Sequence, residues 1–390
     1  MPDAPVIRGA DATSFAHAVL AERHPALIRK VRDATPYGPQ QRRALGELLR
    51  NTVEGALTPP AEDDWWDTWN VRRHAGRSWF DLPFLVAESC FYRQLLCAVG
   101  YFGPGPWQGV DPFRPFKLAE LDTPEAAAEL TALDALSAHP LPDRLKALLH
   151  GSLWGNRADL GFRIQTAEGE STAASPLVAD DSESLLSLLR GDGRPDTGSS
   201  PDGRTLCLVA DNAGRELIPD LLLVDHLLAH AHFDRAVLHL KPYPYFVSDA
   251  TTADTLDAVR HLVTAGTEAG HRLYSALSDG RLTLRAHPFS CAPFPYAEMP
   301  ADLRADFAAA DLTLLKGDLN YRRLVGDRRW SATTPFGEVT SYFPGPVAAL
   351  RTLKSDVITG LTPETEAALV AAEGQRWRTS GTRALIQVRA

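Results

Sequence analysis

The feature that most constrains the fold is the short apolar run Leu206-Cys207-Leu208-Val209-Ala210, which leads directly into Asp211-Asn212-Ala213-Gly214. An unbroken apolar run of this length is typical of a strand that is buried on both faces. A leucine-rich stretch of helical spacing follows, between Leu217 and Leu228. A carboxylate and an amide are therefore expected at the carboxyl end of a buried strand, where open α/β sheets bind ligands.

The Asp211-Asn212 pair allows two interpretations. Its oxygen-rich side chains, with no Cys or His beside them, suit a hard divalent cation. Asp and Asn are also common N-cap residues, and for this motif taken alone capping of the next helix is the favoured interpretation.

Composition limits the class of protein. A chain of 390 residues predicts two or three domains, and its net charge of -9 argues against a general nucleic-acid binder. The four cysteines include no CxxC pair, which predicts reduced thiols in a cytoplasmic protein. No signal-peptide pattern and no apolar run of membrane-spanning length is found. We expect a small-molecule partner and no nucleic-acid or membrane partner; the oligomeric state is not predicted.

The pattern of the chain changes near its middle. The first part has helical spacing, for example at Leu45, Leu48 and Leu49, whereas strand-like and helix-like segments alternate from about Asn156 onward. We therefore expect an all-helical domain over residues 1–155 and an α/β domain over residues 156–390. The tract at 191–203 is rich in Gly, Pro, Ser and Asp, which predicts an exposed, mobile loop.

Two more strand-like runs end in polar residues. The run at 236–241 leads through a proline-rich bend to Phe246-Val247-Ser248-Asp249, and the run at 312–315 leads to Lys316-Gly317-Asp318. In parallel strands of one sheet, these polar residues and Asp211 would lie along the same edge. Three such strand ends favour a shared site over coincidental caps.

Basic residues accompany these acids. Lys316, Arg322 and Arg323 flank Asp318, and Arg351 and Lys354 are three residues apart on a predicted helical stretch, which would present both on one face. Arg and Lys bind phosphate oxygens, and acids that hold a metal beside such cations suit metal-assisted phosphoryl hydrolysis. For any one of these basic residues, a solvated surface position is an equally good explanation.

Several blocks resemble the damage-control phosphatase family, formerly a domain of unknown function. Asp211-Asn212-Ala213-Gly214 and Phe246-Val247-Ser248-Asp249 resemble the metal motifs of that family, and residues 316–322 resemble its substrate motif. Arg351-Thr352-Leu353-Lys354 is similar to the RTxK signature of the acidic-residue methyltransferase-like subfamily, and residues 88–93 and 153–160 are similar to further family blocks. These matches span roughly Glu88 to Lys354 in family order.

The resemblance implies a three-layer α/β/α, Rossmann-like sandwich with an N-terminal all-helical domain. It implies a phosphatase that uses Mn²⁺, Co²⁺ or Ni²⁺, with Mg²⁺ also possible, and that hydrolyses hexose phosphates such as fructose 1-phosphate or fructose 6-phosphate. By motif, the metal ligands would be Asp211, Asn212 and Asp249. The substrate or phosphate contacts would be Asp318, Asn320, Tyr321, Arg322, Arg351 and Lys354.

The expected mechanism assigns catalytic roles to Asp211 and Asp318. A water molecule would attack phosphorus with Asp318 as base or water-orienting group, and direct attack by Asp211 is the alternative. Two other functions remain open: an S-adenosylmethionine-dependent carboxyl methyltransferase, which the family name also implies, and a non-catalytic sugar-phosphate-binding protein.

Overall fold

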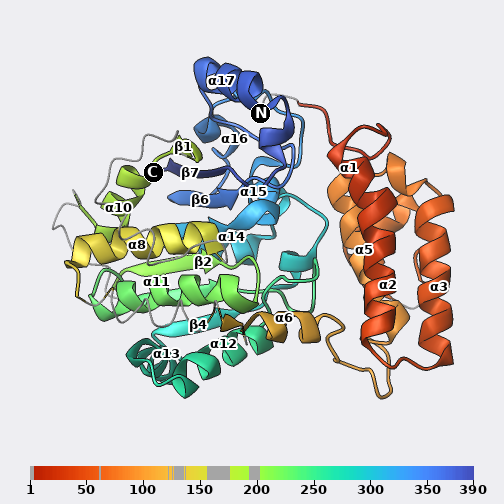
Figure 1. Ribbon diagram of the computed structural model, residues 1–390, viewed down its shortest axis with the longest axis horizontal. Helices are drawn as coiled ribbons and strands as arrows, with labels where there is room; N and C mark the ends of the chain where they lie inside the picture. Colours follow the sequence, from red (N-terminus) through yellow and green to blue (C-terminus); the bar gives the residue numbers. More distant parts are fainter. Residues whose placement is uncertain are drawn as a thin grey trace.

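The computed structural model describes residues 4–60, 63–121, 123, 124, 126, 136, 138–155, 176–192 and 203–390. Within these residues a seven-stranded sheet is flanked by helices, and a bundle of N-terminal helices packs beside it (Figure 1). The predicted α/β sandwich with a helical N-terminal region is confirmed. Most of the predicted loop at 191–203 lies outside the described residues, as does the part of a family block at 156–160.

The N-terminal helices pack around α5. They are α1 (Phe15–Ala18), a π-helix (Val19–Arg23), α2 (His24–Ala34), α3 (Pro39–Glu54), α4 (Trp65–Thr68) and α5 (Phe84–Val99). Helix α5 is apolar on nearly all sides and is buried along most of its length, as expected of a helix in the centre of a bundle. His24 of α2 stacks on Phe91 of α5, with ring centroids 3.7 Å apart.

Seven strands form one mixed sheet in the order β1-β7-β6-β5-β2-β3-β4. They are β1 (Leu177–Asp180), β2 (Thr205–Val209), β3 (Arg235–His239), β4 (Leu282–Arg285), β5 (Leu312–Lys316), β6 (Val347–Thr352) and β7 (Ala384–Arg389). Strands β6, β5, β2, β3 and β4 are parallel, and β7 is antiparallel to β6. The three strands predicted to share an edge, β5, β2 and β3, are neighbours.

Helices cover both faces of the sheet. On one face lie α8 (Leu141–Trp154), α10 (Ser182–Arg190), α11 (Leu217–Ala229), α12 (Thr252–Thr264) and α13 (Glu268–Asp279), which pack on Leu206, Leu208 and Leu314. The other face packs against α14 (Ala301–Ala308), α15 (Gly317–Val325), α16 (Phe336–Val339) and α17 (Pro363–Glu373). Among the described residues, no helix has the length and apolarity needed to cross a bilayer.

The packing of helix α8 suggests a different domain boundary from the one that the sequence predicts at residue 155. In Figure 1, α8 lies over the sheet beside α11, and its Leu145 and Leu149 belong to the same hydrophobic cluster as Leu221. Helix α6 (Arg114–Leu121) likewise contributes Leu121 to that cluster. We propose that the α/β unit begins before α6, so that α6 and α8 belong to it rather than to the helical bundle.

Candidate active site

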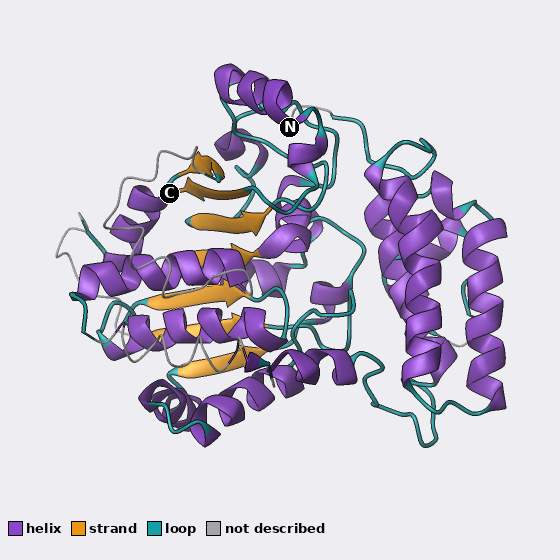
Figure 2. Ribbon diagram, viewed as in Figure 1, coloured by secondary structure: helices purple, strands orange, loops and turns teal. Residues whose placement is uncertain are grey.

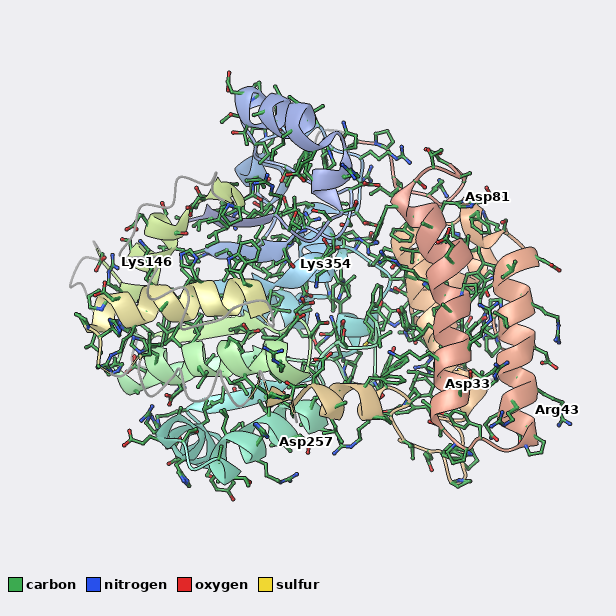
Figure 3. All side chains as sticks on the ribbon, in the orientation of Figure 1. Asp33, Arg43, Asp81, Lys146, Asp257 and Lys354 are labelled. Atoms are coloured by element: carbon green, nitrogen blue, oxygen red, sulfur yellow. The ribbon has the colours of Figure 1, made fainter. Side chains whose placement is uncertain are left out.

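The carboxyl ends of the parallel strands face the N-terminal helices (Figure 2). A small cavity of about 20 Å³ lies at this edge, enough for about one water-sized group. It is lined by the last residues of α8 and by side chains from three strand ends, including Asp211, Lys316 and Lys354. Figure 3 places Lys354 on the side of the sheet that faces the helical bundle.

Asp211 lies against the start of α15. Gly317 has φ of +86°, and a Cβ atom there would stand 1.9 Å from the Asp211 carboxylate. Only glycine adopts this left-handed backbone readily and also leaves room for the carboxylate. The turn between β5 and α15 therefore forms one wall of the Asp211 site.

Asn212 connects the β2 end to the loop that follows β3. Its backbone forms an isolated antiparallel bridge with Asp249. Its Oδ1 accepts a hydrogen bond from Ser248 Oγ at 2.7 Å, and its Nδ2 donates to Glu216 Oε2 at 2.7 Å. The backbones of Asp211, Asn212 and Asp249, the three predicted metal ligands, are thus neighbours, but of the three only Asp211 lines the cavity.

The loop that carries Asp249 is strained. Phe246 has φ of +45° and Val247 has φ of +66°, and a β-branched residue in this region is a genuine outlier. The neighbouring contacts hold the loop in this conformation: Phe246 stacks on Tyr92 of α5 with ring centroids 4.7 Å apart, and Thr251 starts α12 with a capping box. Strain of this kind is concentrated at functional sites.

Two buried lysines contact Asp249. Lys241 Nζ lies 3.3 Å from Asp249 Oδ2, and Lys117 Nζ donates to the Asp249 carbonyl oxygen at 3.2 Å. Burial nevertheless raises the pKa of the Asp249 carboxyl, although Lys241 and then Lys117 act in the opposite direction. Lys117 also pairs with Asp254 at 2.8 Å, so α6 is tied to the start of α12.

The Asp211 carboxyl is the most strongly perturbed acid of the cavity. Burial raises its pKa well above the usual range, and Glu216 and Asp249 add to this effect by like-charge repulsion. Lys354 and Lys316 oppose the shift without cancelling it. The negative charge at Asp211 is therefore incompletely compensated by the protein.

Lys316 is fixed beneath the cavity by α11 and α8. Its ammonium lies 3.0 Å from Asp220 Oδ1 and also donates to the Ser152 carbonyl oxygen, while Ser152 Oγ donates to Asp220 at 2.6 Å. Burial raises the pKa of the Asp220 carboxyl even though Lys316 lowers it. This triad orders the end of α8 that lines the cavity.

Of the six predicted substrate residues, Lys354 lines the cavity and the other five do not. Asn320 donates to the Ala210 carbonyl oxygen at 3.0 Å, and Tyr321 Oη bonds Gln387 at 2.9 Å; both side chains are buried. Arg322 is buried between Asp327 and Glu88, at 2.7 and 2.8 Å. These residues anchor α15 to the sheet and to α5, because every polar group that is buried there needs a partner.

Asp318 and the RTxK residues are joined directly. Arg351 lies at 2.7 Å from Asp318 Oδ1 and is fully buried, and the backbone N–H of Lys354 donates to the same oxygen at 3.2 Å. Burial alone would raise the pKa of Asp318, but Arg351 and Arg322 hold it below its usual value. The carboxylate is therefore ionised and already occupied by donors.

The predicted helix at 351–354 is wrong. Arg351 and Thr352 end strand β6, and Lys354 follows in the loop. The apolar residues 347–350 pair with β5 on one side and β7 on the other, and this tertiary pairing decides the conformation. Arg351 consequently points into the protein while Lys354 is exposed at the cavity, so they do not share a face.

Several site residues were given no role by the sequence analysis: Lys117, Ser152, Glu216, Asp220 and Lys241. A signal existed for Asp220, since a carboxylate within a largely apolar helix needs a buried partner. Lys241 is the last residue of the predicted run at 236–241, close to the edge where Asp211 was expected. No sequence signal links Lys117 to Asp249, which lies 132 residues away along the chain.

Known proteins resemble the chain along nearly its whole length. Residues 19–370 match the family model of the damage-control phosphatase ARMT1-like domain. The chain is 30% identical to Damage-control phosphatase ARMT1 of Danio rerio, covering 96% of this chain and 94% of that protein. It is 29% identical to the Homo sapiens protein of the same name, covering 96% of each.

A solved structure, a DUF89 family protein from Pyrococcus horikoshii, aligns with a TM-score of 0.46 at 15% identity over 89% of this chain and 94% of that one. The family model covers most of the chain, and the full-length relatives agree with it. The chain therefore belongs to the damage-control phosphatase ARMT1-like family and is a phosphatase of that family.

Proposed function

We propose that this phosphatase removes the phosphate group from hexose phosphates, such as fructose 1-phosphate or fructose 6-phosphate, with the help of one divalent ion. The observation that carries the proposal is the position of Asp211: its carboxylate lines a cavity together with Lys316 and Lys354. The carboxylate suits a metal ion and the lysines suit a phosphate group. The sugar specificity rests on the RTxK resemblance of Arg351-Thr352-Leu353-Lys354.

We assign the ion to Asp211, Asn212 and Asp249. No group of three His, Cys, Asp or Glu side chains in the described part of the chain is arranged as a metal site, and this set instead combines two carboxylates with an amide. The donors fit a hard divalent ion, and the incompletely compensated charge at Asp211 is what a cation would neutralise. A bound Mn²⁺, Co²⁺, Ni²⁺ or Mg²⁺ would supply charge neutralisation and acidify water.

The residues of the chain would bind and orient the phosphate ester. Lys354, exposed at the cavity, would bind phosphoryl oxygens and stabilise the charge that develops on them. Asp318 accepts from Arg351 and from the Lys354 backbone, so we propose that it positions the Lys354 segment. Its lowered pKa makes it a weaker proton acceptor than Asp211, whose pKa is raised.

The test is phosphate release from fructose 1-phosphate and fructose 6-phosphate across a panel of divalent ions, with and without chelator. We expect turnover that chelator abolishes and that Asp249→Asn removes. Asp33→Asn, at a carboxylate that is 64% exposed, is the matched control. Release that persists in chelator, or in Asp249→Asn, would contradict the metal assignment; activity only on other phosphate esters would contradict the sugar assignment.

We also propose that the protein acts in the cytoplasm. All four cysteines are free, and Cys90, Cys207 and Cys291 are buried. Burial raises the pKa of each of these thiols, which keeps them in the unreactive, protonated form. In cell fractionation, we expect the protein in the cytosolic fraction. After purification and unfolding, a thiol titration should find four free thiols per chain.

A further inference from the structure

The amide side chain of Asn212 is hydrogen-bonded at both of its polar atoms. Its Nδ2 donates to Glu216 Oε2 and its Oδ1 accepts from Ser248 Oγ, each at 2.7 Å. Asn212 is one of the three residues to which we assign the divalent ion, whereas Glu216 and Ser248 have no role in that assignment. The two partners come from different segments, the turn after β2 and the loop after β3. They are therefore placed to decide how the amide is oriented.

Backbone hydrogen bonds hold these two segments side by side. The Ala213 N–H donates to the Ser248 carbonyl oxygen at 2.7 Å. Asn212 and Asp249, one residue away on each segment, form an isolated antiparallel bridge. Because the backbones are joined at Ser248 and at the residue that follows it, the Ser248 hydroxyl has a fixed place beside the Asn212 amide.

The Glu216 side chain is also held in place. A short 3₁₀ turn (Gly214–Glu216) brings it back to Asn212, four residues earlier in the chain. Gly155, at the end of α8, has φ of +53°, and a Cβ atom there would stand 2.8 Å from Glu216 Cγ. Only glycine readily adopts a positive φ and also leaves room for this side chain. The end of α8 therefore packs against Glu216 and limits where its carboxylate can lie.

The chemistry of the two partners determines which way the amide is turned. A carboxylate can only accept hydrogen bonds, so Glu216 selects the NH₂ group of Asn212 and leaves the oxygen on the other side. A hydroxyl can donate or accept, so Ser248 alone could bond either atom. A metal ion binds the amide oxygen and not the NH₂ group, and the oxygen retains a second lone pair after it accepts from Ser248.

We propose that Glu216 and Ser248 are positioning residues for the divalent ion, because they fix the Asn212 amide with its oxygen available to that ion. The inference rests on the proposed function, since it takes Asn212 as a metal ligand. Replacing partners that orient a ligand in this way typically weakens metal binding about 10- to 100-fold. Glu216 also lines the cavity with Asp211, so the test separates its effect through Asn212 from direct contact with the ion.

The test is the affinity of the full chain for Mn²⁺, measured by calorimetry in the absence of substrate. Glu216→Met removes the acceptor and Ser248→Ala removes the hydroxyl, and each should weaken binding about tenfold. Glu216→Gln keeps an acceptor and Ser248→Thr keeps a hydroxyl, so both should stay within about threefold of wild type. Glu47→Met, at an exposed glutamate of α3, is the control.

Two results of this titration overturn the proposal. One is wild-type affinity in Glu216→Met or in Ser248→Ala. The other is a loss in Glu216→Gln as large as that in Glu216→Met, which would mean that the charge matters and the hydrogen bond does not. Ser248→Ala removes a single hydroxyl from a partly exposed residue, so it tests the proposal even if Glu216→Met does not fold.

A double-mutant cycle separates positioning from direct contact with the ion. If Glu216 acts through Asn212, Glu216→Met should cause no further loss of Mn²⁺ affinity in a chain that already carries Asn212→Ala. A further loss of about tenfold in that background overturns the proposal, because Glu216 would then act on the ion itself.

Asp249→Asn in the same titration tests the proposed function. Unchanged Mn²⁺ affinity in this variant contradicts the metal assignment, and the positioning role then fails with it. Weaker binding in Asp249→Asn together with wild-type affinity in Glu216→Met leaves the metal assignment intact and contradicts the positioning role alone.

Discussion

Asp211 follows β2 and Asp318 follows β5, and because these strands are neighbours the two carboxylates belong to the same edge of the sheet. Their electrostatic environments are opposite. Burial and nearby acids raise the pKa of Asp211, whereas Arg351 and Arg322 hold that of Asp318 below its usual value against the effect of burial. The position at a strand end therefore does not determine the role of an acidic residue. The charged side chains that contact it do.

This difference in electrostatic environment indicates different roles for Asp211 and Asp318, although both lie at the same edge of the sheet. At Asp211 the protein does not fully compensate the negative charge, which is consistent with the metal-ligand role that we propose for it. At Asp318 the protein supplies its own cation, the fully buried Arg351, and thereby fixes the chain that carries Lys354. Variants at the two ends should consequently affect activity and stability in different proportions.

The largest expected effect is on activity at Asp211. Asp211→Asn removes the charge that would hold the metal but keeps the shape, so kcat should fall about 10³-fold, or ~4 kcal/mol. Stability should not fall, because a buried and incompletely compensated charge is removed. Steady-state phosphate release and urea unfolding, both in the same buffer, measure the two quantities. Loss of stability comparable to the loss of activity would contradict the distinction from Asp318.

Arg351→Met should have the converse effect. It leaves the carboxylate of Asp318 buried without its main cation, so the free energy of unfolding should fall by about 3 kcal/mol. Urea unfolding measures this change, and Arg376→Met, at an exposed arginine, is the control. If the Arg351→Met variant is as stable as the parent, Asp318 does not depend on its arginine.

Lys354→Gln should reduce catalysis without affecting stability. If Lys354 stabilises charge on the phosphoryl oxygens as we propose, its removal should lower kcat/KM about 30-fold, or ~2 kcal/mol. The side chain is exposed, so the unfolding midpoint should stay the same. Lys146→Gln, at a lysine that is 50% exposed, does not line the cavity and lies apart from Lys354 in Figure 3, should change neither quantity. A shifted midpoint in Lys354→Gln would assign the lysine a structural role as well.

Local pattern was sufficient to predict the strands that carry the site. The apolar runs before Asp211, Asp249 and Asp318 predicted three parallel strands of one sheet, and in the structure these strands are neighbours. Periodicity could not decide the segment at 347–354, because its pairing with β5 and β7 depends on residues that are distant in the chain. The same limit applies to Arg322, whose partner Glu88 lies on α5.

Asp318 and Glu88 both pair with buried arginines, but their pKa values shift in opposite directions. The pH dependence of stability therefore extends the comparison of buried carboxyls. The pKa of Asp318 is lowered, so its stabilising contribution is present above the usual value of 3.8 and is lost as the pH falls through the lowered one. Burial raises the pKa of Glu88 to about 7 despite Arg322, so wild type should lose stability relative to Glu88→Gln as the pH rises from 4.5 towards 7.

Urea unfolding of wild type, Asp318→Asn and Glu88→Gln between pH 3 and pH 8, at about unit steps, measures these slopes. The stability advantage of wild type over Asp318→Asn should shrink by on the order of 1 kcal/mol at the acid end. The difference in unfolding free energy between wild type and Glu88→Gln should instead change near neutral pH. Here wild type should lose stability relative to the variant as the pH rises. If the unfolding free energies of the two variants, relative to wild type, changed with pH in the same way, burial and arginine pairing would have equal weight at Asp318 and Glu88. The contrast between Asp318 and Asp211 would then need another cause.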